Sequence, residues 1–279
     1  MTAERWQLHW DAPGDGRANM AKDAWLLRRA ARDGTASLRL YGWERPTLSV
    51  GRAQKVERQV DLAACAALGL PVVRRATGGR AVLHGPDLTY AVAAPLAGGR
   101  FAGGILDIYR EISRVFLRYF EDLGLGPHAQ AYTGRERAQA ASPVCFETPS
   151  AFEILLRGRK IVGSAQRLLP RAFLQHGSIP LSPQAELLAR VFLDADAAAI
   201  SAGMTDLATE LGAEAPPLHE LRARLVSAFE ETFGIELTPA PWLAEDEAAV
   251  QELRAEFPWL VAAPQDAPAP GAGPPSRAG

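Results

Sequence analysis

The spacing of apolar residues predicts a chain in which helices and short strands are interspersed. Apolar side chains recur at helical intervals in the segments 19–33, 60–68, 104–123, 184–193, 218–233 and 245–256. Shorter runs, either apolar or alternating and bounded by Gly or Pro, occupy 71–75, 80–84, 88–93, 151–156, 159–167 and 172–179. Such runs are typical of β-strands. The two kinds of segment do not alternate strictly, so the pattern favours an α+β domain (α/β with a mixed sheet) over a doubly wound parallel sheet.

The same pattern divides the chain into three parts. Residues 1–215 contain the predicted strands and form one large domain, and residues 216–262 form a small C-terminal helical appendage. Residues 263–279 are rich in Pro, Ala and Gly and have almost nothing to bury, so we expect a disordered tail. Within the large domain, the pair Arg157-Gly158 separates two strand-like runs and indicates a β-hairpin.

Composition and charge exclude several classes of protein. The chain of 279 residues has 30 basic and 32 acidic side chains, which argues against a nucleic-acid-binding protein with a wholly basic surface. Two cysteines are too few for a disulfide scaffold and suit a reducing cytoplasm. There is no apolar run of about 20 residues and no basic-then-apolar start. We therefore expect a cytoplasmic protein that binds neither membranes nor nucleic acid.

A glycine pair between arginines is the first candidate for chemistry. Segment 74–86 reads RRATGGRAVLHGP, so that Gly78 and Gly79 follow Arg75 and precede His84. Paired glycines let the backbone approach a ligand closely, and arginines beside such a turn suit a carboxylate or a phosphate. The segment matches neither a Walker phosphate-binding loop nor the dinucleotide-binding fingerprint. The alternative is an ordinary glycine turn flanked by solvated arginines.

The two cysteines have different surroundings. Cys145 lies in a loop ahead of the strand predicted from residue 151, where its thiol is placed to act as a nucleophile and to carry an acyl group as a thioester. A buried, inert thiol is the alternative for Cys145. Cys65 lies in the apolar helical run 62–68, where an inert buried cysteine is expected.

Lysine is rare in this chain, which draws attention to Lys160. Of the 30 basic residues only three are lysines. In the strand predicted over 159–167, alternation places Lys160 and Ser164 on one face. Gly163 and Ala165 lie on the other face, where they leave room for a bulky group. A lysine beside a ligand can stabilise a carboxylate, an oxyanion or a thiolate. The alternative is a solvated charge at the tip of a hairpin.

The histidines do not indicate a metal site. His84 follows the glycine turn, and His176 lies with Gly177 in the predicted strand 172–179, so both histidines are candidates for a binding site. A satisfied core or surface histidine is the alternative for each. The sequence has no Cys-x-x-Cys and no Glu/His pair at helical spacing, so we expect no bound metal.

Taken together and in order, these segments resemble the lipoate-handling family of acyltransferases and ligases. The matching segments are Asn19-Met20-Ala21, Leu48 to Arg52 with Gln54, Arg74 to His84, Cys145-Phe146 with Pro149-Ser150, Gly158 to Gln166, and Gln175 to Ser178. The match extends from about residue 5 to residue 260. It implies the catalytic fold that this family shares with biotin protein ligases, in which helices flank a central mixed sheet.

Within the family, the cysteine-dependent octanoyltransferases are most similar, because Cys145 falls where that branch carries its nucleophile. Lys160 falls on the family's site lysine. The resemblance implies an enzyme that takes octanoyl from octanoyl-acyl carrier protein onto Cys145. It then passes the group to a lysine of a lipoyl-domain protein, such as the glycine cleavage H protein. One departure is His84-Gly85-Pro86, where the family usually has His-Asp.

The resemblance also implies a set of binding residues and leaves three other activities open. The residues implied to bind substrate are Arg75, Gly78, Gly79, His84, Gly163, Ser164, Ala165, His176 and Gly177. No bound cofactor is implied for the transferase. The first alternative is an ATP-dependent lipoate or octanoate ligase, which would use ATP and magnesium. The others are an amidotransferase that moves octanoyl between carrier proteins and a non-catalytic protein that binds acyl groups or carriers.

Overall fold

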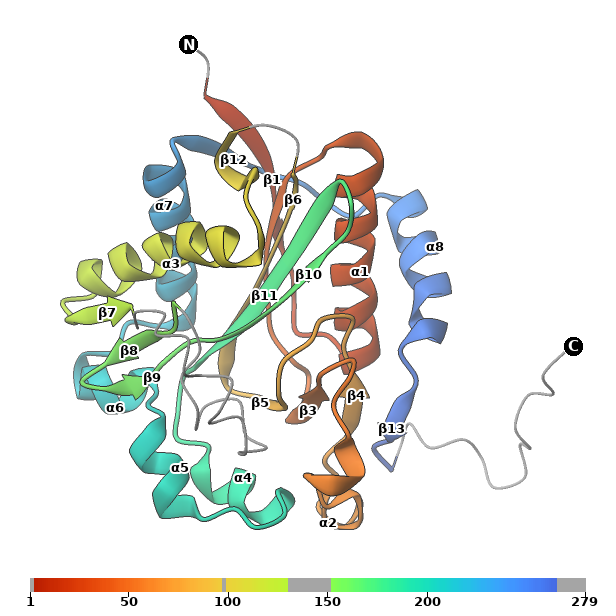
Figure 1. The fold of residues 1–279 in the computed structure, drawn as a ribbon, viewed down its shortest axis with the longest axis vertical. Helices are drawn as coiled ribbons and strands as arrows, with labels where there is room; N and C mark the ends of the chain where they lie inside the picture. Colours follow the sequence, from red (N-terminus) through yellow and green to blue (C-terminus); the bar gives the residue numbers. More distant parts are fainter. Residues whose placement is uncertain (1–2, 97–98, 130–151, 265–279) are drawn as a thin grey trace, which may run out of the picture.

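The computed structural model describes residues 3–96, 99–129 and 152–264. Within these ranges the strands form three sheets (Figure 1). The strands of the large sheet, in spatial order, are β10 (Gly163–Leu168), β11 (Ala172–Pro180), β6 (Asp87–Pro95), β2 (Ser37–Tyr41), β1 (Glu4–Trp10) and β12 (Ile235–Pro239). β1 is parallel to β2 and β12, whereas the other neighbours are antiparallel. The large sheet is therefore mixed, and the predicted fold class is confirmed.

Two smaller sheets lie beside the large one. The second sheet consists of β13 (Trp259–Val261), β4 (Val72–Arg74), β3 (Thr47–Val50) and β5 (Val82–His84), and the hairpin sheet of β7 (Pro127–Ala129), β8 (Ile154–Leu156) and β9 (Arg159–Lys160). β8 and β9 form the hairpin predicted at Arg157-Gly158. Both turn residues have positive φ, at 49° and 79°, as a two-residue type I′ turn requires.

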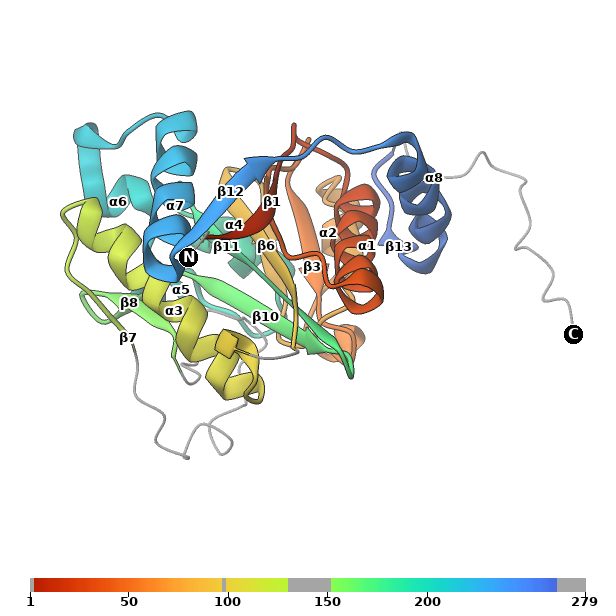
Figure 2. The ribbon, with the colours of Figure 1, turned by 90° about the horizontal axis from the view of Figure 1, so that it is seen from above.

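Helices cover both faces of the large sheet. Figure 2 shows α1 on one face, called here the α1 face, and α3 with α7 on the opposite α3 face. α8 packs on the outer side of α1. The helices are α1 (Gly16–Asp33), α2 (Leu62–Ala67), α3 (Ile105–Asp122), α4 (Ala185–Val191), α5 (Ala197–Gly203), α6 (Leu207–Leu211), α7 (Leu218–Phe233) and α8 (Ala244–Leu253). In the described ranges, no helix combines the length and apolar character needed to cross a membrane.

The sequence explains where the two main helices begin and what they bury. Asp15 caps α1 by accepting hydrogen bonds from the N–H groups of the first turn, and Gly34 ends the helix with φ of 79°. In α3, apolar residues three or four positions apart, among them Ile112, Phe116 and Phe120, are buried in the core under the large sheet. Burial of each such side chain contributes about 1.5–3 kcal/mol.

The C-terminal segment 216–262 is more than the expected helical appendage. Besides α7 and α8 it contributes β12, which pairs with β1 at the edge of the large sheet, and β13, which pairs with β4. These strands are short, so their alternation covers too few positions to indicate a strand by pattern alone. The division of the chain at residue 216 stays a prediction, and residues 265–279 of the expected tail lie outside the described residues.

The run 159–167, predicted as one strand, is two strands in different sheets. β9 ends at Lys160 in the hairpin sheet, and β10 begins at Gly163 in the large sheet. The expectation that Lys160 and Ser164 share one face of a strand is therefore wrong, because strand alternation does not continue across a break. The expectation for Gly163 and Ala165 concerns β10 alone and is unaffected.

Candidate active site

A pocket with about 300 Å³ of empty space, part of it open to solvent, lies where the large sheet faces the second sheet. Of the residues expected to bind substrate, those that line it are Arg75, His84, Gly163, Ser164, Ala165, His176 and Gly177. Its other lining residues are Met20, Tyr41, Ser49, Val82, Thr89 and Ser178. Met20, Ser49 and Ser178 lie within the matching sequence segments, which is the signal that could have identified them.

The glycine turn lies beside the pocket and is held in place by Arg75. The Arg75 Nη2 group donates to the carbonyls of Gly78 at 2.7 Å and Arg80 at 2.6 Å. Gly79 has a φ of 80°, which favours glycine. A Cβ at Gly51 would lie 2.0 Å from the Gly79 carbonyl oxygen, so the backbones of the two loops are in direct contact. Gly78 and Gly79 are not among the residues that line the pocket.

His84 is held between a hydroxyl and a carboxylate. Its Nε2 lies 2.8 Å from Ser49 Oγ, its Nδ1 lies 2.8 Å from Asp87 Oδ2, and its ring stacks on Trp43 with 4.0 Å between ring centroids. Burial lowers the pKa of His84, although the nearby Asp87 carboxylate opposes the shift. The ring is therefore neutral at pH 7.

Asp87 was missed by the sequence reading. The family's usual aspartate directly after the histidine is Gly85 here, and Asp87, two positions further along the chain, contacts His84 instead. Asp87 Oδ2 also accepts hydrogen bonds from Thr89 at 2.9 Å and Ser178 at 2.7 Å. His84 is therefore paired with a carboxylate although no aspartate directly follows it.

His176 has the same kind of environment on the other side of the pocket. Its Nε2 lies 2.7 Å from Thr77 Oγ1 and its Nδ1 lies 2.7 Å from Asp23 Oδ2. Asp23 also pairs with Arg39 at 2.7 Å and accepts a hydrogen bond from the Tyr41 hydroxyl at 2.9 Å. Burial alone would raise the pKa of Asp23, but the hydrogen bond from His176 and the charge of Arg39 outweigh it and lower that pKa.

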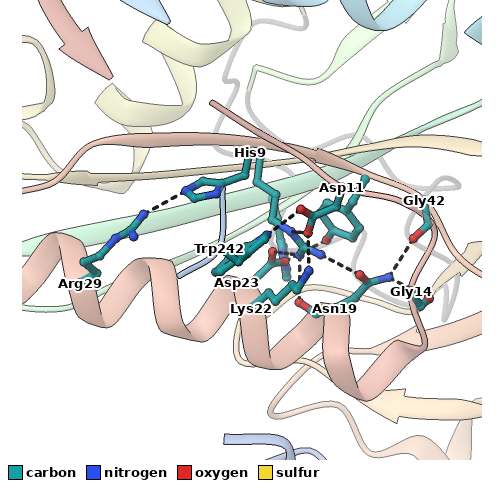
Figure 3. A network of polar contacts seen from close by, with 12 residues as sticks. His9, Asp11, Gly14, Asn19, Lys22, Asp23, Arg29, Gly42 and Trp242 are labelled. Carbon is teal, nitrogen blue, oxygen red and sulfur yellow. Dashed lines mark hydrogen bonds and ion pairs between the residues drawn. The ribbon is translucent and has the colours of Figure 1, made fainter. Parts of the chain in front are cut away.

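A buried network of charges continues from Asp23 underneath α1 (Figure 3). Arg39 is fully buried and donates to Asp11 at 2.8 Å, to Asp23 and to the Asn19 side chain at 2.8 Å. The carboxylates of Asp23 and Asp11 raise the pKa of Arg39 against the opposing effect of burial. Asp11 in turn accepts a hydrogen bond from Trp242 at 2.7 Å. The network therefore joins the C-terminal segment to the pocket wall.

Lys160 lies apart from this pocket, in the hairpin sheet. Its side chain is 3% exposed, and its Nζ lies 2.5 Å from a carboxylate oxygen of Glu153. The alternative of a solvated charge at the hairpin tip is therefore wrong. Glu153 was not predicted as a site residue. Cys145 lies outside the described residues, so its position relative to Lys160 stays a prediction.

A second pocket of about 310 Å³ lies on the α3 face, and Glu153 and Ser164 are among its lining residues. Ser164 lines both pockets. Its hydroxyl lies 2.8 Å from the Tyr90 hydroxyl, which also accepts a hydrogen bond from Gln175 at 3.2 Å. Burial raises the pKa of Tyr90 to about 12, so this phenol stays protonated. Ser164 and Tyr90 therefore connect the wall of one pocket to the next.

Cys65 is buried in α2, within the hydrophobic cluster under the second sheet. Burial, with a smaller effect from Asp61, raises the pKa of the Cys65 thiol to about 11. The prediction of an inert thiol is supported, because a thiol with this pKa is protonated at pH 7. Among the described residues, no group of three or more His, Cys, Asp or Glu side chains is placed to hold a metal ion.

Comparisons with known proteins identify the family of the chain. Residues 15–230 match the model of the lipoyl protein ligase A/B catalytic domain family. The chain belongs to this family. The octanoyltransferase LipM of Geobacillus kaustophilus is 38% identical to it, covering 79% of this chain and 84% of the relative. The octanoyltransferase LipM of Kyrpidia tusciae is 35% identical, covering 91% and 96%. The family resemblance read from the motifs is confirmed.

Solved structures of lipoate ligases share the fold. A bipartite lipoate protein ligase from Thermoplasma acidophilum matches with a TM-score of 0.75 and 20% identity, covering 91% of this chain and 93% of that chain. Lipoate-protein ligase A bound with ATP matches with a TM-score of 0.74 and 21% identity, covering 92% and 95%. These similarities confirm the lipoate ligase-like fold.

Proposed function

We propose that this protein is an octanoyltransferase of lipoate assembly. The observation that carries the proposal is the pocket between the two sheets, in a chain whose relatives at 32% to 41% identity are named octanoyltransferases. These relatives confirm the expectation of an acyltransferase enzyme. An octanoyl chain has six methylenes, and at about 0.8 kcal/mol each their burial would supply nearly 5 kcal/mol before the costs of binding.

In the proposed reaction, the sulfur of Cys145 attacks the thioester carbon of octanoyl-acyl carrier protein. The bond from that carbon to the donor sulfur breaks, and the donor leaves as a thiol. The lysine amine of a lipoyl-domain protein then attacks the acyl-enzyme, an amide forms, and the Cys145 thiol is regenerated. Lys160, buried and paired with Glu153, is the cation proposed to stabilise the thiolate and the developing oxyanion. The transferase needs no bound cofactor.

An acidic acyl carrier protein is the proposed donor, and its docking surface would be basic. Arg52, Lys55 and Arg58 are exposed on the loop that follows β3. This loop begins at Gly51, which contacts the glycine turn beside the pocket. Electrostatic attraction at this loop would speed the encounter with an acidic carrier. The proposed acceptor is a lipoyl-domain protein such as the glycine cleavage H protein.

Intact-mass analysis after mixing the protein with octanoyl-acyl carrier protein tests the proposal. We expect a mass increase of one octanoyl group that hydroxylamine removes and that is absent from Cys145→Ser. Cys65→Ser is the matched control and should retain the adduct, because Cys65 is buried and protonated at pH 7. Full transfer activity in Cys145→Ser, together with octanoate-dependent exchange between ATP and pyrophosphate, would instead establish the ligase alternative. Saturable binding without turnover would establish the non-catalytic one.

A further inference from the structure

Both pocket histidines are connected to Arg75 in the same way. Arg75 Nε donates to Thr77 Oγ1 at 3.1 Å, and Arg75 Nη1 donates to Ser49 Oγ at 3.2 Å. The Thr77 hydroxyl lies 2.7 Å from His176 Nε2, and the Ser49 hydroxyl lies 2.8 Å from His84 Nε2. One guanidinium therefore meets two hydroxyls, and each hydroxyl meets one imidazole.

When each ring is neutral, the chemistry of these groups gives every hydrogen bond a direction. Each histidine Nδ1 faces a carboxylate, Asp87 for His84 and Asp23 for His176, and an ionised carboxylate only accepts. Each Nδ1 therefore carries a proton and donates it. In a neutral imidazole the other nitrogen then accepts, so each hydroxyl donates to Nε2 while its oxygen accepts from Arg75.

The charges facing His84 favour the neutral ring. Burial and the positive charge of Arg75 disfavour a second proton on His84, whereas Asp87 favours it. A protonated Nε2 would also turn the Ser49 hydroxyl from a donor into an acceptor, and its own hydrogen would lose its partner. The geometry and the local charges therefore point to the same tautomer.

The carboxylates are fixed as firmly as the hydroxyls. Asp87 is held by Thr89 and Ser178, and Asp23 is held by Arg39 and Tyr41. These four contacts leave little freedom for either carboxylate to turn away from its histidine.

The lining of the pocket is polar in residue type but satisfied within the protein. Among the described residues, the buried side-chain atoms without a hydrogen-bond partner include none from Ser49, Thr77, His84 or His176. An apolar ligand against this wall breaks no hydrogen bond. If one polar atom of the wall had no hydrogen-bond partner in the protein, it would have to keep a bound water. Otherwise the bound ligand would lose the free energy of that hydrogen bond.

We propose that Arg75 is a positioning residue that orients both histidines, through Ser49 and Thr77, so that the Nδ1 proton of each ring points to its carboxylate. The sequence motifs predict that Arg75 binds substrate directly. In the structure, Nε, Nη1 and Nη2 of Arg75 each donate a hydrogen bond to an oxygen of the protein. Because the polar groups of the pocket wall have their hydrogen-bond partners within the protein, the pocket favours an apolar acyl chain. This part of the proposal rests on the proposed function. Ser49 and Thr77 are then residues that determine the affinity for that chain.

Long-range ¹H–¹⁵N NMR spectra of the full chain, labelled with ¹⁵N-histidine, test the tautomers without any substitution. The chain has five histidines, of which His128 and His219 are exposed and serve as internal references. At pH 8 we expect His84 and His176 to give the signature of rings whose proton lies on Nδ1. A ring whose proton lies on Nε2 at pH 8, in either residue, would overturn the proposal.

Thr77→Val removes the hydroxyl while keeping the shape of the side chain. We expect the KM for octanoyl-acyl carrier protein to rise about tenfold, since a buried histidine nitrogen loses its donor, while kcat changes less than about threefold. Thr77→Ser is the matched control and should restore the KM and the His176 signal. An unchanged KM in Thr77→Val, with wild-type melting temperature, would overturn the proposal. If the histidines have the predicted tautomers but the protein has no transferase activity, the proposed function is overturned and the role of Arg75 is not.

Discussion

Aromatic and aliphatic side chains form the core on the α3 face of the large sheet, whereas on the α1 face a chain of buried charges leads to the pocket. Alternation along β2 sends Leu38 and Leu40 into the apolar core that contains Phe120, while Arg39 points to the α1 face. Apolar packing stabilises a fold without demanding particular partners. The charges on the α1 face hold specific groups in place, at the cost of removing them from water.

The largest expected effects come from removing a central residue on either face. Arg39→Leu removes the arginine that pairs with buried Asp23 and leaves Asp11 with Lys22 alone, and Phe120→Ala leaves a cavity. Each should lower the free energy of unfolding by about 3–5 kcal/mol, as measured by denaturant titration. Only Arg39→Leu should also raise the KM for octanoyl-acyl carrier protein, measured at a temperature where both variants are folded, because Asp23 is hydrogen-bonded to His176. Equal KM values for the two variants would show that the charges on the α1 face have no more effect on substrate binding than the apolar core on the α3 face.

Lys160→Ala should change kcat without changing the affinity for the acyl chain. Loss of the cation proposed for the oxyanion should lower kcat by about 10²–10³-fold, whereas the satisfied wall of the first pocket is unchanged and should retain affinity for the acyl chain. Steady-state kinetics measure both quantities. Arg5→Ala removes an exposed cation of β1 and is the control. A change in KM alone for Lys160→Ala would place this lysine in binding rather than in catalysis.

The charged α1 side should also make stability depend on pH. Burial, followed by the charge of Arg29, lowers the pKa of His9 from 6.5 to about 4. Between these values the unfolded chain binds a proton that the folded chain does not, so stability is fully present above pH 6.5 and falls as the pH drops to 4. The loss from this group is about 3 kcal/mol. Denaturant titration of His9→Gln should show a flatter pH profile, whereas the exposed-site control His219→Gln should match the wild type.

The smallest of these effects concerns the closely packed strands between the two pockets. A Cβ at Gly177 would lie 2.5 Å from the Gly163 carbonyl oxygen and 2.6 Å from Tyr90 Cε1. Gly177→Ala should therefore lower stability by about 1–3 kcal/mol through overpacking. At Gly126 an added Cβ meets nothing within 4 Å, so the melting temperature of Gly126→Ala should equal or exceed that of the wild type. Similar melting temperatures for the two variants would show that the strands can shift to make room.

The sequence predicted the fold class and the motifs of the site, because both depend on local patterns. Arg75, His84, His176 and Gly177 were identified and line the pocket. The partners of these residues were not identified. Asp23 pairs with His176 across 153 positions of the chain, and no local pattern in the helical segment that contains Asp23 distinguishes it from a solvated acid.

Predictions also failed where one run of residues serves two sheets. Lys160 and Ser164 belong to different strands although their spacing fits a single one. β12 was missed because the pairing with β1 that stabilises it involves residues more than 200 positions away. Asp87 could have been noticed in the sequence, since a carboxylate three residues after His84 can reach Nδ1 of that histidine once Gly85 and Pro86 form the intervening turn.

Transfer from the isolated acyl-enzyme tests the central claim most directly. The protein is acylated with octanoyl-acyl carrier protein, freed of donor by desalting, and mixed with a lipoyl-domain protein while both masses are followed. We predict that the enzyme loses one octanoyl group at the rate at which the lipoyl domain gains it, and that Cys145→Ser transfers nothing. An acyl-enzyme that keeps its octanoyl group, while the lipoyl domain is modified only when donor is added again, would contradict the account.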